Sequence, residues 1–91
     1  MPDNAKENGK IEVVVDTSYF TTMERYTEWE ETVGERKVRP YMTFLCEHKI
    51  IKSWSLDGNP QDVERLLALS PQQWKKVNEQ VVGKINGLFQ D

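Results

Sequence analysis

The sequence contains only one cysteine, Cys46, and one histidine, His48, among its 91 residues. A single cysteine excludes a disulfide within the chain, and one cysteine with one histidine does not supply the ligand spacing of a zinc site. A chain without disulfides fits a reducing compartment. We therefore expect a cytoplasmic protein without a bound metal ion.

Long apolar segments and an excess of basic residues are also absent. No apolar run approaches the roughly 18 residues of a membrane-spanning helix, and residues 1–10 are polar rather than an apolar signal segment. The 12 lysines and arginines are outnumbered by 15 acidic residues, which gives a net charge of −3. Because phosphate contacts require many basic side chains, we expect neither a membrane nor a nucleic acid as a partner.

Motifs that carry catalytic chemistry are missing as well. The sequence has no glycine-rich phosphate loop, nucleophile elbow or histidine pair. Cys46, Glu47 and His48 stand next to one another, but side chains one or two positions apart on a helix do not face each other. We expect Cys46 to be a small core residue and His48 to be partly buried. The sequence therefore predicts a protein that is not an enzyme and holds no cofactor.

The N-terminal part of the sequence predicts a tail followed by a strand. Residues 1–10 offer almost nothing to bury and are expected to form a flexible tail, with residues 11–91 as a single small domain. The β-branched run from Ile11 to Val15 is the best strand candidate. Its partner is either a segment around Val38 to Thr43 or another subunit. An unpaired edge is a natural assembly surface, so Val13 and Val15 are candidate protein-binding residues.

A helical pattern follows from Tyr19 to Gly34, with capping groups in Asp16, Thr17 and Ser18. The alternative is that Tyr19 to Thr22 prolong the strand, because aromatic and β-branched residues fit sheets well. The expected buried stripe of this helix consists of Met23, Tyr26, Glu30 and Val33, with Phe20 and Trp29 beside it.

This helix is strongly acidic, and its glutamates have two interpretations. The first is a helix face that is merely solvated. The basic residues that follow, Arg36, Lys37 and Arg39, favour this interpretation because they offset part of the acidic charge. The second is a contact surface for a basic site on another protein. Under the second interpretation the candidate protein-binding residues are Glu24, Glu28, Glu30 and Glu31.

The second half of the sequence predicts three more helices. The first runs from Pro40 to Ser53, and a turn at Leu56 to Asn59 separates it from a short helix that Asn59 caps and Pro60 opens. Ser70 and Gln73 form a capping box for the last helix, which begins at Pro71. Its apolar stripe consists of Trp74, Val77, Val81, Ile85 and Leu88. The predicted fold is mainly α, with three to four helices and one short N-terminal strand; the alternative is an α+β fold with a small sheet or hairpin.

The segment from Ile50 to Trp74, I-I-K-S-W-S-L-D-G-N-P-Q-D-V-E-R-L-L-A-L-S-P-Q-Q-W, resembles small tail-associated proteins of bacterial viruses. In these proteins a W-x-L element is followed by a D/E-G-x-P turn, a short helix ending in leucine and a helix that starts with proline. Such proteins are commonly tail assembly chaperones, which bind the tape-measure protein and help tail-tube subunits polymerise. The matching positions are Ser53, Trp54, Leu56, Gly58, Pro60 and Leu67.

The resemblance implies a non-enzymatic bacteriophage protein that binds a tail tape-measure or tail-tube protein in the host cytoplasm and that can form a homo-oligomer. A second hypothesis is a small acidic viral inhibitor that occludes a basic site on a host defence enzyme. A third is a minor structural subunit of a viral particle, with the Ile11 to Val15 strand added to a neighbour's sheet.

Overall fold

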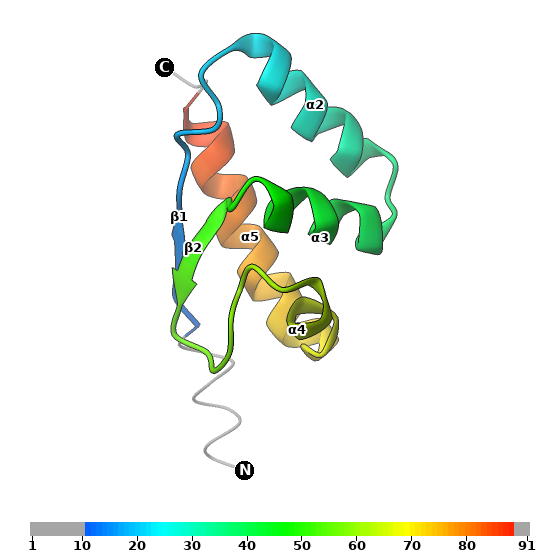
Figure 1. Cartoon of the computed structure of the whole chain (residues 1–91), viewed down its shortest axis with the longest axis vertical. Coiled ribbons are helices and arrows are strands. Elements are labelled where there is room, and N and C mark those ends of the chain that lie inside the picture. Colours follow the sequence, from blue (N-terminus) through cyan, green and yellow to red (C-terminus); the bar gives the residue numbers. More distant parts are fainter. Residues whose placement is uncertain (1–10, 89–91) are drawn as a thin grey trace.

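The computed structural model describes residues 11–88, which form four helices and a two-stranded antiparallel sheet. Figure 1 shows α5 running through the domain, with the sheet on one side of it and α2 and α3 on the other. The mainly helical class is confirmed, whereas the predicted tail at residues 1–10 lies outside the described residues. In chain order the elements are β1 (Val13–Val15), α2 (Met23–Gly34), α3 (Val38–Glu47), β2 (Ile51–Trp54), α4 (Val63–Leu67) and α5 (Pro71–Gly87).

Strand β1 pairs with β2, so two expectations about the middle of the chain were wrong. Val13 lies opposite Trp54 and Val14 opposite Ser53, with a bulge before Val15. The segment from Val38 to Thr43, expected as a possible strand partner, belongs to α3. The helix expected from Pro40 to Ser53 instead runs over Val38–Glu47. A left-handed residue, Lys49 with a φ of 52°, reverses the chain into β2.

Helix α5 supplies the centre of the core. Val77, Val81 and Ile85 from its predicted stripe are fully buried. The predicted capping box is confirmed, because the Ser70 hydroxyl accepts from the Gln73 amide at 3.1 Å and the Gln73 side chain accepts from the Ser70 amide at 3.0 Å. These paired bonds satisfy two of the backbone donors that a helix start leaves open. The local sequence therefore defines where α5 begins.

Helix α2 differs from its prediction in both its start and its buried face. It begins at Met23, because the Thr22 hydroxyl accepts from the amide of Arg25 at 3.2 Å and caps the helix there. Its one buried residue is Trp29, while Met23 is 60% exposed and Val33 37% exposed. One large indole thus anchors the helix, whereas the sequence pattern predicted that Met23, Tyr26, Glu30 and Val33 would together form its buried face.

The turn before α4 depends on Gly58, which has the predicted positive φ, at 90°. The Arg65 guanidinium holds this turn, since its Nε donates to the carbonyl of Asp57 at 2.8 Å. The Trp54 indole donates to the carbonyl of Gly58 at 3.0 Å, and the Arg65 guanidinium lies 5.4 Å from the centre of the Trp54 ring. The N-cap of α4 is Asp62 rather than the expected Asn59, whose side chain accepts from Gln61 within the turn.

Replacing Gly58 with alanine is expected to lower the free energy of unfolding by about 1–2 kcal/mol, the cost of a left-handed residue with a Cβ. The added Cβ would also lie 2.6 Å from the Nε of Arg65, which must then leave its hydrogen bond. Urea unfolding measures the change. Gly34→Ala is the matched control, because nothing lies within 4 Å of its added Cβ and it should not destabilise. Equal losses in the two variants would contradict this account of the turn.

Candidate protein-binding surface

Helix α2 and the residue after it carry a line of exposed acidic side chains. Glu24, Glu28 and Glu31 are spaced by four and three residues, which places them on one side of the helix, and Glu35 continues the line. We call these four residues the acidic stripe. Glu30 is rotated from Glu31 by roughly 100°, one residue's turn in an α-helix, and lies outside the stripe. The structure therefore groups three of the four glutamates that the sequence marked and separates the fourth.

A groove with a volume of about 420 Å³ lies beside the acidic stripe, where α2 and α3 meet. Its lining combines the apolar rings of Pro40 and Phe44 with carboxylates from Glu35 and Glu47. The groove is shallow and open, as a surface that contacts another protein would be. We call it the α2–α3 groove; it is lined by Thr32, Glu35, Arg39, Pro40, Thr43, Phe44 and Glu47.

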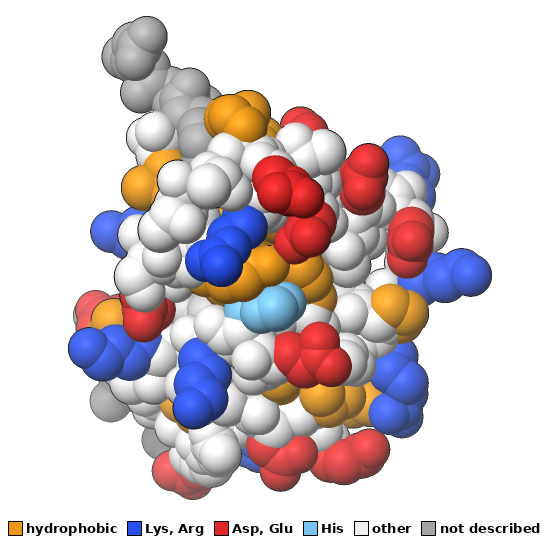
Figure 2. Space-filling view, turned by 45° about the horizontal axis from the view of Figure 1, so that its top comes forward, with side chains coloured by type: hydrophobic (Ala, Val, Ile, Leu, Met, Phe, Trp, Pro, Cys, Tyr) orange, Lys and Arg blue, Asp and Glu red, His pale blue; other side chains and the backbone are white. Residues whose placement is uncertain are grey.

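Three rings pack together at one end of this groove. Tyr19 stacks on His48 with ring centroids 4.1 Å apart, and Phe44 meets the His48 ring edge-on at 4.6 Å. Figure 2 shows the chain's single imidazole beside apolar side chains, with acidic and basic groups around them. These contacts join the loop before α2 to the C-terminal half of α3. They hold one wall of the groove in place.

The acidic stripe is tied to this ring cluster through Tyr19. The Tyr19 hydroxyl donates to Glu28 at 2.8 Å, and the Arg25 guanidinium lies 4.8 Å from the ring centre. Partial burial of the phenol, followed by its hydrogen bond to Glu28, raises the pKa of Tyr19 above its ordinary value. The hydroxyl therefore remains a hydrogen-bond donor at neutral pH, and it orients the Glu28 carboxylate.

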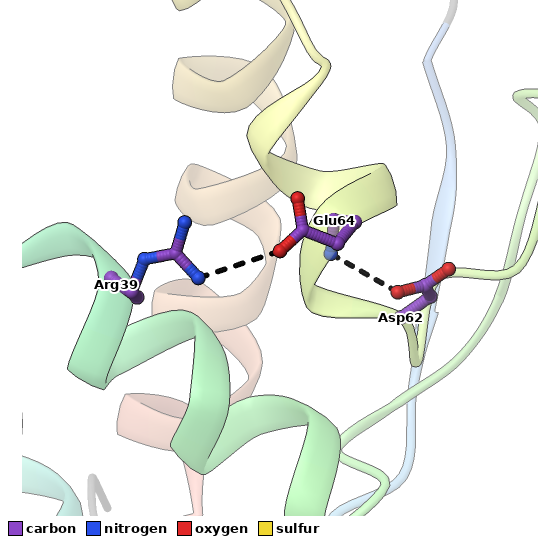
Figure 3. A network of polar contacts seen from close by, with 3 residues as sticks. All are labelled: Arg39, Asp62 and Glu64. Carbon is purple, nitrogen blue, oxygen red and sulfur yellow. Dashed lines mark hydrogen bonds and ion pairs between the residues drawn. The ribbon is translucent and has the colours of Figure 1, made fainter.

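The one basic side chain in the groove lining, Arg39, faces a carboxylate of another helix. Its guanidinium lies 3.5 Å from a carboxylate oxygen of Glu64 in the first turn of α4, beside the cap formed by Asp62 (Figure 3). Both partners are largely exposed, so the pair adds little stability. The pair does offset the positive charge of Arg39, so Glu35 and Glu47 make the net charge of the groove negative.

The other predicted protein-binding residues, Val13 and Val15, lie in β1, away from the acidic stripe. Val13 is buried, and its amide donates to the Gln80 side chain of α5 at 2.9 Å. The NH₂ group of the same Gln80 side chain donates to the carbonyl of Ile11 at 2.7 Å. Gln80 thus takes the place of a neighbouring strand along this part of the edge. That part of β1 is already hydrogen-bonded within the chain, and Val15 is half-buried.

Cys46 and His48, two positions apart in the sequence, do not form a reactive pair. Burial raises the pKa of the Cys46 thiol to about 11, so it stays protonated at neutral pH. The His48 ring packs against Tyr19 and Phe44, and both Cys46 and His48 are partly buried, the latter as expected. Within residues 11–88, no three His, Cys, Asp or Glu side chains are placed to hold a metal ion. No helix in this part of the chain has the length and apolar character needed to cross a membrane.

Comparison with protein-family models, with curated proteins and with solved structures finds no match to this chain. The resemblance of residues 50–74 to tail assembly chaperones therefore stays a prediction from the sequence. In the structure this segment supplies β2, the Gly58 turn, α4 and the start of α5.

Sequence reasoning missed the contribution of Phe44 and Glu47 to the surface. The spacing of Phe44 and His48 by four residues was a usable signal, because side chains at that spacing meet on a helix. Nothing in the sequence indicated that Tyr19, more than twenty residues earlier, would complete the cluster.

Proposed function

We propose that this chain is a non-enzymatic protein that binds a basic surface of a partner protein through the acidic stripe and the α2–α3 groove. The observation that carries the proposal is the position of exposed carboxylates along and beside a groove that also presents the apolar rings of Pro40 and Phe44. Isolated surface glutamates are ordinary, whereas carboxylates around the exposed Pro40 and the half-buried Phe44 give the arrangement of a polar rim and an apolar centre that interfaces have.

The chemistry of the groove favours lysine and arginine side chains. Their apolar stems can pack on Pro40 and Phe44 while the charged ends reach carboxylates of Glu35 and Glu47. The face of an exposed ring also attracts a cation directly. An acidic surface of this kind raises the rate of encounter with a basic partner and makes binding sensitive to salt.

A pair of neighbouring substitutions tests the proposal. Glu31→Lys reverses a charge within the acidic stripe, and Glu30→Lys makes the same change outside it. Each exposed attraction is worth about 0.2–1 kcal/mol, so replacing one with a repulsion costs up to about 1–2 kcal/mol, or roughly tenfold in Kd. We expect Glu31→Lys to weaken binding of the captured partner by that factor at low salt and Glu30→Lys to leave it nearly unchanged.

The partner is obtained by using the tagged wild-type chain and both variants as baits in lysate from infected cells. Proteins retained by wild type and Glu30→Lys but lost with Glu31→Lys are the candidates, and calorimetry with the purified candidate gives the Kd values. Recovery of the same proteins by all three baits would contradict the proposal.

For the biological role, we propose a tail-assembly-chaperone-like protein, on the sequence resemblance of residues 50–74. Its partner is then a tape-measure or tail-tube protein, and deletion of the gene should reduce the yield of complete tails or change their length. An unchanged yield and length of tails after deletion would contradict this role.

The acidic stripe also favours a second role, that of an inhibitor of a host enzyme with a basic site. In that case the captured protein is a host enzyme, and its activity falls as the wild-type chain is added. The Glu31→Lys chain should inhibit it roughly tenfold less well, and the Glu30→Lys chain should inhibit as the wild type does.

A further inference from the structure

We propose a second docking site on the opposite side of the α2–α3 connection, which receives an acidic segment of a partner protein with one large apolar side chain. The site is a pocket of about 180 Å³ that we call the corner pocket. This inference does not depend on the acidic stripe and remains testable if the function proposed above is wrong. The corner pocket is lined by Val33, Arg36, Lys37, Val38, Tyr41, Trp74 and Asn78.

The walls of the corner pocket are apolar and partly open to solvent. Val33 is 37% exposed and Val38 49% exposed, so two of the five exposed large hydrophobic side chains within residues 11–88 line one pocket. Behind them the half-buried Trp74 ring packs edge-on against Tyr41 at 5.8 Å. A cavity of about 150 Å³ accepts a benzene ring, so this pocket has room for one side chain of that size.

The rim of the corner pocket is basic, in contrast to the α2–α3 groove. Arg36 and Lys37 both lie in its lining, and neither forms an ion pair with another group in residues 11–88. Asn78 accepts the hydroxyl of Tyr41 through its side-chain oxygen, which leaves its NH₂ group as a donor. Cations and an amide donor around an apolar pocket match a large apolar side chain next to a carboxylate.

The backbone at Arg36 gives a second observation. Arg36 has a φ of 59°, and its amide donates to the carbonyl of Val33 at 3.1 Å. A residue in this position after a helix is usually glycine, because a Cβ is disfavoured there. The chain instead has Gly34 two residues earlier and a long cation at the left-handed position beside the pocket. The left-handed backbone at Arg36 thus places a cation, rather than a glycine, in the lining of the pocket.

Lys49 offers a matched control for Arg36. It is also basic and left-handed, with a φ of 52°, and its amide donates to Cys46 just after α3. It does not line the corner pocket. Arg36→Gly and Lys49→Gly therefore each remove one positive charge and one disfavoured backbone conformation. They differ in their distance from the proposed site.

The experiment pans a displayed random-peptide library against the full chain and measures the Kd of the enriched synthetic peptides by fluorescence anisotropy. We expect enrichment of peptides with one Leu, Phe or Trp next to Asp or Glu. Arg36→Gly should weaken their binding roughly tenfold, the loss of one charge-assisted contact, while Lys49→Gly binds as the wild type does. The melting temperature of Arg36→Gly should equal or exceed that of the wild type, which separates lost binding from lost folding.

Three results would overturn the proposal. The first is a library without enriched acidic, apolar peptides. The second is enrichment of peptides whose Kd for Arg36→Gly equals their Kd for Lys49→Gly. The third is concentration-dependent self-association of the free chain that Arg36→Gly abolishes and Lys49→Gly does not, because the occupant of the corner pocket would then be a second copy.

Discussion

Trp29→Ala is expected to lower the free energy of unfolding by about 3–5 kcal/mol, the usual cost of removing a buried large ring. Trp29 is 3% exposed and is the buried residue of α2. It packs against Phe20 and Tyr26, with ring centroids 6.4 and 5.8 Å from its own. Without this anchor α2 loses most of its contact with the core, and the acidic stripe loses its fixed position. Urea unfolding measures the change in stability.

Trp29→Phe is the control, because it keeps a ring in the site and removes the indole N–H. That Nε1 is buried without a hydrogen bond of ordinary geometry among the described residues, although it lies near enough to the Tyr41 hydroxyl to favour the ionised phenol. A poorly satisfied buried donor is costly, so its removal offsets part of the lost packing. We expect Trp29→Phe to cost less than about 1.5 kcal/mol, as shape-conserving core changes do. Equal destabilisation by phenylalanine and alanine would show that the ring does not anchor the helix.

Stability is expected to fall by roughly 2–3 kcal/mol between pH 10 and pH 12 because of Tyr41. Burial raises the pKa of Tyr41 to about 12, although the nearby Trp29 indole acts in the opposite direction. In this interval the unfolded chain loses the phenol proton while the folded chain keeps it. The stabilisation is therefore complete below pH 10 and disappears as the pH rises to about 12.

Urea unfolding at a series of pH values, on the wild type and on Tyr41→Phe, tests this expectation. The variant should lose the part of the alkaline slope between pH 10 and pH 12 that comes from Tyr41. A slope that begins near pH 9 remains in both proteins, because burial raises the pKa of Cys46 from 9.0 to about 11 and also raises the pKa of Tyr19. The same slope in the wild type and the variant would contradict the assignment to Tyr41.

The elements predicted well from the sequence are those with local signals. Helix α5 carries its own capping box at Ser70 and Gln73 and a stripe of apolar residues at helical spacing. Gly58 lies in a turn whose neighbouring residues favour reversal, and the structure gives it the expected positive φ. Each of these features is decided by side chains within a few residues of one another, so no knowledge of the tertiary fold is required.

The errors concern contacts between distant parts of the chain. Ile51 and Trp54 have the three-residue spacing of a helix, and only pairing with Val13–Val15, about forty residues earlier, makes them a strand. In α2, the sequence pattern put Met23 on the expected buried stripe and Trp29 beside it. The structure buries Trp29, whose indole packs against Phe20 and Tyr26, and leaves Met23 exposed.

The candidate site was predicted as a set of charges but not as a surface. Glutamates 24, 28 and 31 are grouped by helical spacing, which the sequence contains. The groove beside them exists because α3 places Phe44 and Glu47 next to Thr32 and Glu35 of the neighbouring helix. That arrangement depends on how two helices pack, and no local pattern specifies it.

Hydrogen–deuterium exchange of the chain with and without its captured partner tests the central claim most directly, because it locates the contact without a substitution. Binding through the acidic stripe and the α2–α3 groove predicts slower exchange at the amides of residues 28–35 and 41–47, with little change in α5 and in the sheet. Slower exchange confined to β1, β2 or the C-terminal half of α5, with residues 28–35 unchanged, would contradict the claim.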